Sequence, residues 1–297
     1  MRAEVSTPIA FILVLLVWST TPLAISLSVA DRPLLAVALR MLIGCAFCYG
    51  LLRLRGQRLP NQREDLWQYA IAGGSLYVTM ILVYQAAVTV PSGWIAVIFG
   101  LSPIVTGVIS LPFEKEAALT PIRGAGLVLG FGGLYLVFAG SLSLDQAHLY
   151  GLLLVFIGMF VASASSVALR LLVRDSSTSG LQITTGGLVF AVPLYFATAV
   201  IAEPWAWPNF DTQHLLAMLY LGVIGSGVAM VLYFSLLKRL PATKLALMML
   251  ITPIAALALG SLINNEPVVA SVWLGAICVS VGILIYEFKP RFGLRRL

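Results

Sequence analysis

Uncharged apolar runs of about 20 residues recur along the whole chain, and they restrict its fold more than any other feature. A helical run of this length crosses the ~30 Å hydrocarbon core of a bilayer. Because lipid cannot satisfy backbone polar groups, spanning segments are helices or closed barrel strands, and continuous rather than alternating apolar sequence selects helices. The composition agrees, since 60% of the 297 residues are hydrophobic and 10% are charged. The sequence therefore predicts an all-α membrane protein.

Ten spanning helices are predicted from these runs. The first resembles a signal peptide, but it is long enough to span, and the internal repeat described next needs it, so we expect it to be retained. The ten segments lie near residues 7–28, 33–52, 66–89, 92–112, 121–140, 149–172, 180–201, 213–237, 241–263 and 268–288.

The pattern of the segment from Pro91 to Leu111 is repeated 150 residues later, from Pro241 to Ser261. An unbroken offset over about 45 residues indicates two related halves. We expect residues 1–140 to form the first repeat, 141–148 an outer linker, and 149–297 the second repeat with a basic tail. The paired residues include Ala96 with Ala246, Pro103 with Pro253, Glu116 with Glu266 and Gly132 with Gly282.

The basic residues indicate the orientation in the membrane. If the N-terminus is cytoplasmic, sixteen Lys and Arg fall on the inner side, Arg32 falls outside and Arg40 falls within the second segment. The positive-inside rule then predicts cytoplasmic N- and C-termini and an even number of spans in the cell inner membrane. The net charge of +6 thus reports topology rather than a nucleic-acid partner. With five helices per half, the second half is inverted, and such folds bind substrate near the midplane.

Pro103 and Pro253 are expected to act as hinges or kinks near the bilayer centre. A proline inside a helix removes one hydrogen bond and frees a carbonyl, which is tolerated at this depth where protein or water satisfies it. A kink used only for packing is the alternative to a cavity-lining role. The neighbouring positions that we expect to face a cavity are Phe99, Ser102, Met249 and Thr252.

Clustered hydroxyl groups mark corresponding helices of the two halves. The first span contains Trp18, Ser19 and Thr20, and the sixth contains Ser163 within Val161–Ser166. Such hydroxyls either bond back to their own helix or form a cavity wall. Arg40 is an intramembrane charge, which is a functional candidate by default. It either anchors helix carbonyls or contacts a substrate carboxylate.

The chain lacks the groups that several function classes require. No Asp or Glu lies at mid-span, which disfavours proton antiport through a buried carboxylate, and no activated nucleophile, metal site or cofactor motif is evident. The glycines around Gly126 and Gly130 indicate close helix packing rather than a dinucleotide loop. Aromatic side chains suit a neutral or zwitterionic substrate, although each could instead face lipid or core. The candidates are Tyr77, Tyr84, Trp94, Phe99 and Tyr233.

Taken together, the ten-span plan, the repeat, Trp18-Ser19-Thr20, Arg40, the paired prolines and the glycine-rich fifth helix resemble the EamA family of the drug/metabolite transporter superfamily. The resemblance implies two five-helix repeats around a central cavity and export of amino acids or other small metabolites. We therefore expect a secondary transporter that works by alternating access, not an enzyme. Its expected partners are a small-molecule substrate and the bilayer, and it would be a monomer or homodimer. An intramembrane enzyme acting on a lipid-linked substrate, or a non-transporting membrane subunit, is the alternative.

Overall fold

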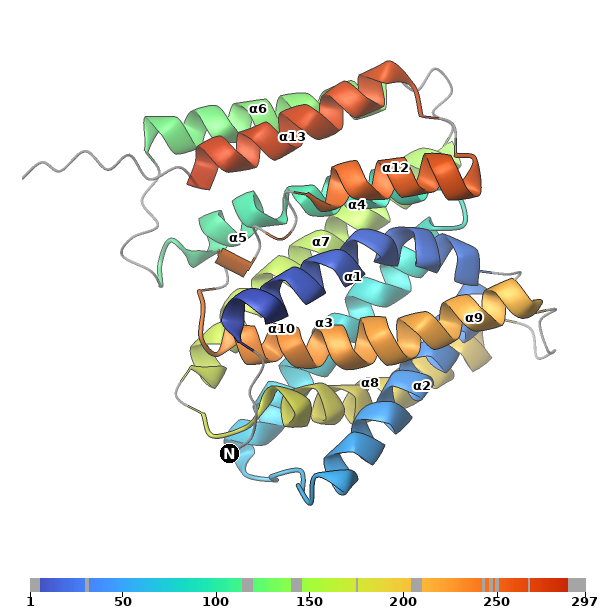
Figure 1. Ribbon diagram of the computed structural model, residues 1–297, viewed down its shortest axis with the longest axis vertical. Coiled ribbons are helices and arrows are strands. Elements are labelled where there is room, and N and C mark those ends of the chain that lie inside the picture. The colour runs from blue at the N-terminus through green and yellow to red at the C-terminus, as the bar shows by residue number, and fades with distance from the viewer. Residues whose placement is uncertain are drawn as a thin grey trace, which may run out of the picture.

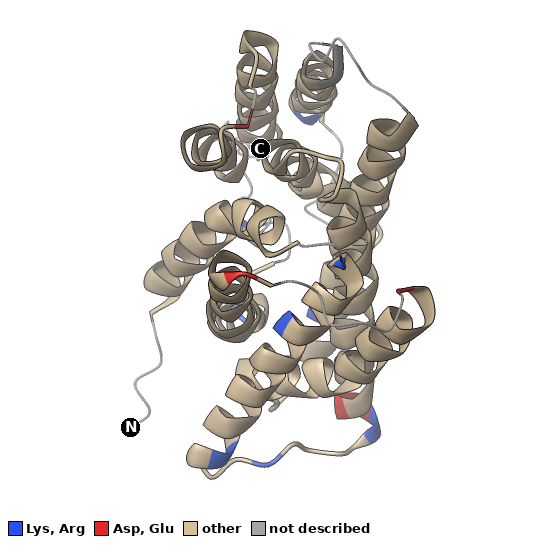
Figure 2. Ribbon diagram, turned by 90° about the vertical axis from the view of Figure 1, so that its right-hand side faces the viewer, with Lys and Arg blue, Asp and Glu red and all other residues tan. Residues whose placement is uncertain are grey.

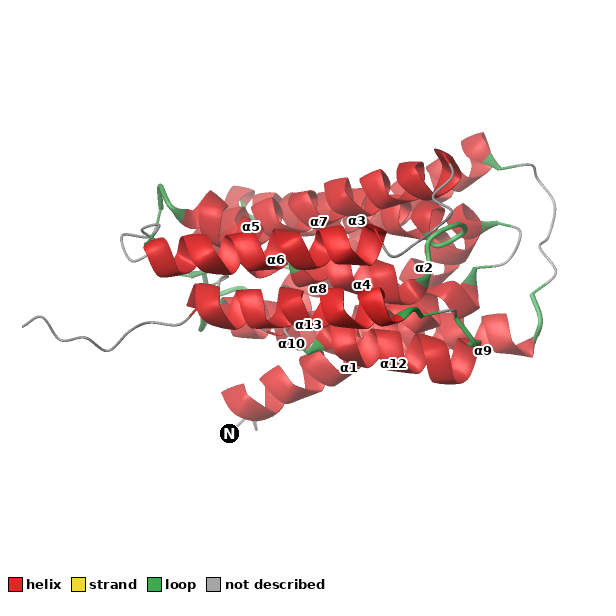
Figure 3. Ribbon diagram, turned by 90° about the horizontal axis from the view of Figure 1, so that it is seen from above, coloured by secondary structure: helices red, strands yellow, loops and turns green. Residues whose placement is uncertain are grey.

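The computed structural model is helical throughout the part of the chain that it describes, and its helices run side by side with loops at both ends (Figure 3). Within the described residues, seven helical segments are long and apolar enough to cross a membrane, and three shorter apolar helices accompany them. The described residues are 6–29, 32–113, 120–139, 146–174, 176–203, 210–241, 244–245, 248, 251–266 and 268–287.

The helices of the two sequence halves follow the predicted segments closely. The first half contains α1 (Thr7–Ser28), α2 (Pro33–Leu54), α3 (Arg63–Ala86), α4 (Ser92–Gly100), α5 (Ser102–Ser110) and α6 (Pro121–Ala139). The second half contains α7 (Gln146–Val173), α8 (Gly180–Ala202), α9 (Thr212–Tyr220), the π-helix η2 (Leu221–Ala229), α10 (Met230–Leu237), α12 (Thr252–Asn264) and α13 (Ala270–Glu287).

The two repeated prolines lie in the first turn of a helix. Pro103 is the second residue of α5, directly after the break at Leu101, and Pro253 is the second residue of α12. A proline in the first turn costs no hydrogen bond, because the N–H that it lacks has no partner within the helix. The kink expected at Pro103 is thus a break between two short helices. For Pro253 the helix is described only from Thr252, since most of 242–250 lies outside the described residues.

Helices from the two halves pack against one another in pairs. Helix α2 lies against α8, α4 against α12 and α6 against α13, while α3 lies against α7 and α1 against α9, η2 and α10. Figure 1 shows α6 and α13 side by side at one edge of the bundle. Glycine permits this contact, because an added Cβ at Gly126 would lie 2.5 Å from the carbonyl oxygen of Gly282. The prediction that Gly126 serves helix packing is confirmed.

Apolar side chains cover much of the outer surface. On α6, Val128 is 75% exposed and Tyr135 is 70% exposed. Large apolar residues at this level of exposure suit contact with lipid rather than water. Charged residues occupy few positions along the ribbon (Figure 2). The chain is therefore a membrane protein.

Polar contacts join helices near the ends of the bundle. The Glu203 carboxylate, which follows α8, accepts hydrogen bonds from the backbone N–H of Leu34 (2.7 Å) and Leu35 (3.0 Å) at the start of α2. Near the other end, Nη1 of Arg170 on α7 donates to the carbonyl oxygens of Leu237 and Lys238, both at 2.6 Å. Both contacts satisfy backbone groups that helix ends leave without partners.

Candidate functional site

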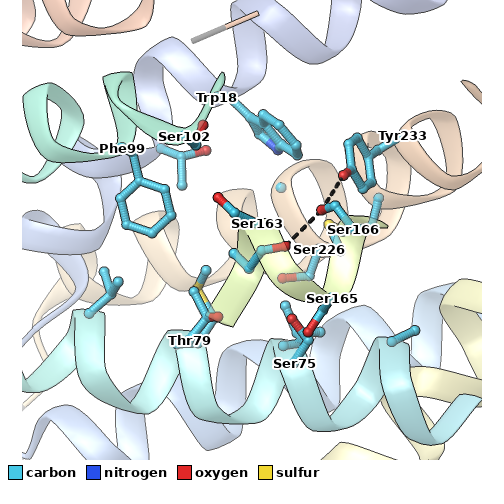
Figure 4. Close-up of a pocket in the computed structure, with 18 of the residues that line it drawn as sticks. Trp18, Ser75, Thr79, Phe99, Ser102, Ser163, Ser165, Ser166, Ser226 and Tyr233 are labelled. Atoms are coloured by element: carbon cyan, nitrogen blue, oxygen red, sulfur yellow. Dashed lines mark hydrogen bonds between the residues drawn. The ribbon is translucent and has the colours of Figure 1, made fainter. Parts of the chain in front are cut away.

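A cavity of about 200 Å³ lies inside the bundle, and side chains from both halves of the sequence line it. Helices α1, α2, α3, α4 and α5 contribute residues from the first half. The second half contributes residues from α7, η2, α10 and α12. Its walls combine apolar groups with hydroxyls (Figure 4), which is the character expected of a small-molecule site.

An aromatic group forms one wall of the cavity. The rings of Trp18 on α1 and Tyr233 on α10 have centroids 5.0 Å apart at an interplanar angle of 44°. The Tyr233 hydroxyl lies 2.7 Å from Ser166 Oγ on α7 (Figure 4). Because the Ser166 hydroxyl donates to the carbonyl oxygen of Ala162, it accepts the proton of Tyr233. The wall is thereby held by three helices.

Hydroxyl groups lie among the apolar side chains that line the cavity, and α3 supplies two of them. Ser75 and Thr79 are four residues apart and so share one face of α3. Thr79 Oγ1 donates to the carbonyl oxygen of Gly158 at 3.2 Å, while Ser163 and Ser165 come from α7. The sequence prediction missed Ser75 and Thr79 because it concentrated on the tyrosines of this helix. Ala72, Ser75, Thr79 and Val83 recur at helical spacing, which predicts that they share one face of α3 but not that this face meets the cavity.

Arg40 also lines the cavity, although it is only 3% exposed. Its Nε donates to Ser226 Oγ in η2 at 3.1 Å, and its Nη1 donates to the Tyr84 hydroxyl at 3.3 Å. The guanidinium carbon lies 5.8 Å from the centroid of the Tyr84 ring. Tyr84 is fully buried and does not line the cavity, so it holds the Arg40 side chain in place without contacting the cavity itself.

The structure brings about half of the predicted site residues together. Those that line the cavity are Trp18, Arg40, Phe99, Ser102, Ser163, Tyr233 and Thr252. They come from seven helices, and both halves of the sequence contribute. Pro103 and Pro253 are buried beside Ser102 and Thr252 but do not line the cavity. Met249 lies outside the described residues.

The remaining predicted residues lie elsewhere in the bundle. Ser19 bonds back to the carbonyl oxygen of Leu15, and Thr20 bonds to that of Val17 and to the Tyr220 hydroxyl. Both hydroxyls are therefore satisfied by carbonyls of α1, and that of Thr20 also joins α1 to α9. Tyr77 hydrogen-bonds to Thr198 on α8, and Trp94 is buried within α4.

Apart from Arg40, no lining residue in the described part of the chain is charged. Within those same ranges no cluster of His, Cys, Asp and Glu could hold a metal ion. The carboxyl of Asp211 has its pKa lowered by a hydrogen bond from the backbone N–H of His214. That contact is the cap of α9, and Asp211 does not line the cavity.

Comparison with known proteins places the chain among transporters. The uncharacterized transporter YoaV of Bacillus subtilis strain 168 is 26% identical over 294 residues, which cover 96% of this chain and 97% of YoaV. The uncharacterized inner membrane transporter YedA of Escherichia coli K12 is 24% identical over 292 residues, covering 93% of this chain and 90% of YedA.

A solved crystal structure with 23% sequence identity has the same fold, with a TM-score of 0.72 over 94% of this chain and 96% of its own. The EamA-like transporter family matches residues 6–139 and 149–287, so the match covers most of both sequence halves. As the resemblance of its sequence indicated, this chain belongs to the EamA-like transporter family.

Proposed function

We propose that the protein is a secondary transporter of the inner membrane that exports small metabolites, namely amino acids or related neutral and zwitterionic solutes, by alternating access. The observation that carries this proposal is the cavity, which both sequence halves line. Its aromatic and hydroxyl walls suit one small molecule with an apolar body and a few polar groups. The names of the relatives also favour transport over catalysis.

The helix pairs support an arrangement of ten spans in two inverted repeats. At the offset of 150 residues, α2 is equivalent to α8 and α6 to α13, and each of these pairs is in contact. At the same offset α1 is equivalent to α7, and α3 is equivalent to the segment from α9 to α10. The contact of α3 with α7 is therefore the counterpart of the contact of α1 with α10. A two-fold relation between the halves would produce this pattern. Five spans per half would invert the second half and leave both termini in the cytoplasm.

No observation favours the alternative of an intramembrane enzyme. Nucleophilic catalysis by a hydroxyl needs an adjacent base such as an imidazole or carboxylate. The hydroxyls of the cavity have no such neighbour among its described lining residues. A non-transporting subunit would have no use for a cavity that both sequence halves line.

Transport in proteoliposomes tests the proposal. We expect the purified protein to move radiolabelled apolar amino acids, and Phe99→Ala, which removes an aromatic group from the cavity, to reduce this flux. Phe131→Ala is the matched control, because Phe131 is exposed on α6 and does not line the cavity. Absence of flux for amino acids and for other small amphipathic solutes, with metabolite export unchanged between deletion and overexpressing cells, would contradict the proposal.

A further inference from the structure

Arg40 places a positive charge beside the cavity without an opposite charge among its contacts. Its hydrogen-bond acceptors are Ser226 Oγ, the Tyr84 hydroxyl and, at 3.8 Å, the sulfur of Met80. All three are neutral. A guanidinium stays protonated in proteins, and an unpaired charge inside a membrane protein is costly. The environment of Arg40 would therefore be completed by an anion.

The edge of the guanidinium between Nη1 and Nη2 can bind that anion when Nη1 gives up its weak contact with the sulfur of Met80. Arg40 Nη2 makes no hydrogen bond to any residue in the described ranges, and Nη1 uses one of its protons on the distant sulfur of Met80, a weak acceptor. Gly225, which also lines the cavity, leaves space beside this edge, since an added Cβ there would lie 3.5 Å from Nη2. Nη1 and Nη2 together match the two oxygens of one carboxylate.

Close helix packing fixes the direction in which this edge points. An added Cβ at Gly44 would lie 2.9 Å from the carbonyl oxygen of Gly222, so α2 and η2 approach each other closely. That approach places Ser226 against Nε and leaves the opposite edge of the guanidinium for the cavity. Because the fork is planar and rigid, a guanidinium held in this way is preorganised for a carboxylate.

We infer that Arg40 binds the carboxylate of the transported molecule, and that the substrates are small amphipathic monocarboxylates. This inference rests on the proposed function and narrows it. No acidic side chain lines the described part of the cavity to demand an ammonium group. The α-amino group of an amino acid is therefore dispensable, whereas its carboxylate is required.

Four related compounds separate these requirements. L-leucine and 4-methylpentanoate carry a carboxylate, whereas L-leucinamide and isopentylamine do not. We expect the two carboxylates to raise the unfolding temperature of the purified protein in detergent, and the other two to leave it unchanged. Equal stabilisation by leucinamide or isopentylamine would overturn the inference.

Variants assign the effect to Arg40. Arg40→Gln should weaken the apparent affinity for both carboxylates by about tenfold or more, because it removes a charge-assisted bidentate contact. Arg40→Lys should give an intermediate loss, since it keeps the charge but not the fork. Arg53→Gln is the matched control on the same helix, and Arg53 is exposed away from the cavity.

Gly225→Val keeps Arg40 and fills the space beside Nη2, so it covers the case in which Arg40→Gln does not fold. It too should abolish stabilisation by both carboxylates, and unchanged stabilisation in this variant would overturn the inference. Failure of all four compounds to stabilise the wild-type protein would overturn it as well. The flux assay decides the proposed function separately, because transport of uncharged solutes without a carboxylate requirement would keep the transporter and remove the role of Arg40.

Discussion

At the scale of single residues, Trp18 occupies a central place in the cavity. Its ring packs against Tyr233, whose hydroxyl is fixed by Ser166, so α1, α7 and α10 meet at one aromatic wall. Aromatic pairs of this kind contribute more than the apolar area they bury. The affinity of the cavity for a substrate therefore depends on the relative positions of these three helices.

Trp18→Ala should therefore weaken substrate binding. Removal of the indole opens the aromatic wall, and we expect the apparent Km for export to rise about tenfold, equivalent to roughly 1.4 kcal/mol. Trp18→Phe should recover part of the loss because it restores an aromatic surface. The comparison is made against Trp67→Ala, since Trp67 is exposed near the start of α3. An equal effect of both alanine variants would argue against a role of the Trp18 ring.

The residues of α1 also show what the sequence could and could not predict about the site. Trp18, Thr21, Pro22 and Ile25 line the cavity at helical spacing, whereas the hydroxyls of Ser19 and Thr20 bond to carbonyls of the same helix. Periodicity predicts which residues share a face, but not which face meets the cavity. Which face meets the cavity depends on the neighbouring helices. The sequence motif alone therefore predicted Ser19 and Thr20 as site residues, although they do not line the cavity.

At the scale of helices, α6 and α13 pack closely through glycine. An added Cβ at Gly133 would lie 2.6 Å from the carbonyl oxygen of Gly275, whereas at Gly132 it would meet no atom within 4 Å. Adjacent glycines of one helix therefore differ sharply in their surroundings. The glycine-rich pattern predicted close packing, but only the structure identifies the contacting face.

Gly133→Ala should separate the α6–α13 pair and destabilise the protein by about 1 to 3 kcal/mol, the usual cost of overpacking. Gly132→Ala adds the same methyl group to open space and should be neutral or slightly stabilising, because alanine favours helix more than glycine. Thermal unfolding of both variants in the same detergent measures the difference. Equal unfolding temperatures would contradict the packing role of Gly133.

Glu203 links the end of α8 to the start of α2. Its carboxylate accepts two backbone N–H hydrogen bonds at a helix N-terminus, where a negative charge is favourable. We expect Glu203→Ala to lower the free energy of unfolding by about 1 to 2 kcal/mol, and Glu203→Gln by less. Denaturation in detergent provides the measurement, with Glu64→Ala, at an exposed position of α3, as the control. A loss no larger than that of the control would exclude the capping role.

At the scale of the whole molecule, the uncharged runs and the repeat predicted the helix order well. They failed in detail at the π-helix η2, whereas the interruption expected at Pro103 is present as a break between α4 and α5. Hydrophobic length specifies a helix that crosses the bilayer, but it does not specify the hydrogen-bond register within that helix. Register is decided by packing against neighbours, and here Gly222 packs against Ile43 and Arg40 of α2.

The distribution of Lys and Arg predicts which loops face the cytoplasm, and labelling can check it. In a variant without Cys45, Cys48 and Cys278, we expect Asp211→Cys to react with a membrane-impermeant maleimide in intact spheroplasts. Asn61→Cys should react only after permeabilisation, because an odd number of proposed spans separates the two positions. The cysteine-free variant alone controls for background. Reaction of both positions under the same condition would contradict the ten-span arrangement.

The π-helix η2 determines how the charged side of the cavity, at Arg40, is oriented relative to its aromatic side, at Trp18 and Tyr233. A π-helical stretch carries a surplus residue relative to an α-helix, and each residue of an α-helix advances the chain by about 100° around the axis. Ser226, which orients Arg40, precedes α10, which carries Tyr233 beside Trp18. Deletion of one residue from 227–229, between Ser226 and α10, would turn α10 by about 100° relative to Ser226, so that Ser226 and Tyr233 would no longer face the cavity together. We therefore expect the π-helical register of η2 to keep the charged side and the aromatic side of the cavity in alignment, and a one-residue deletion variant that still folds should lose transport.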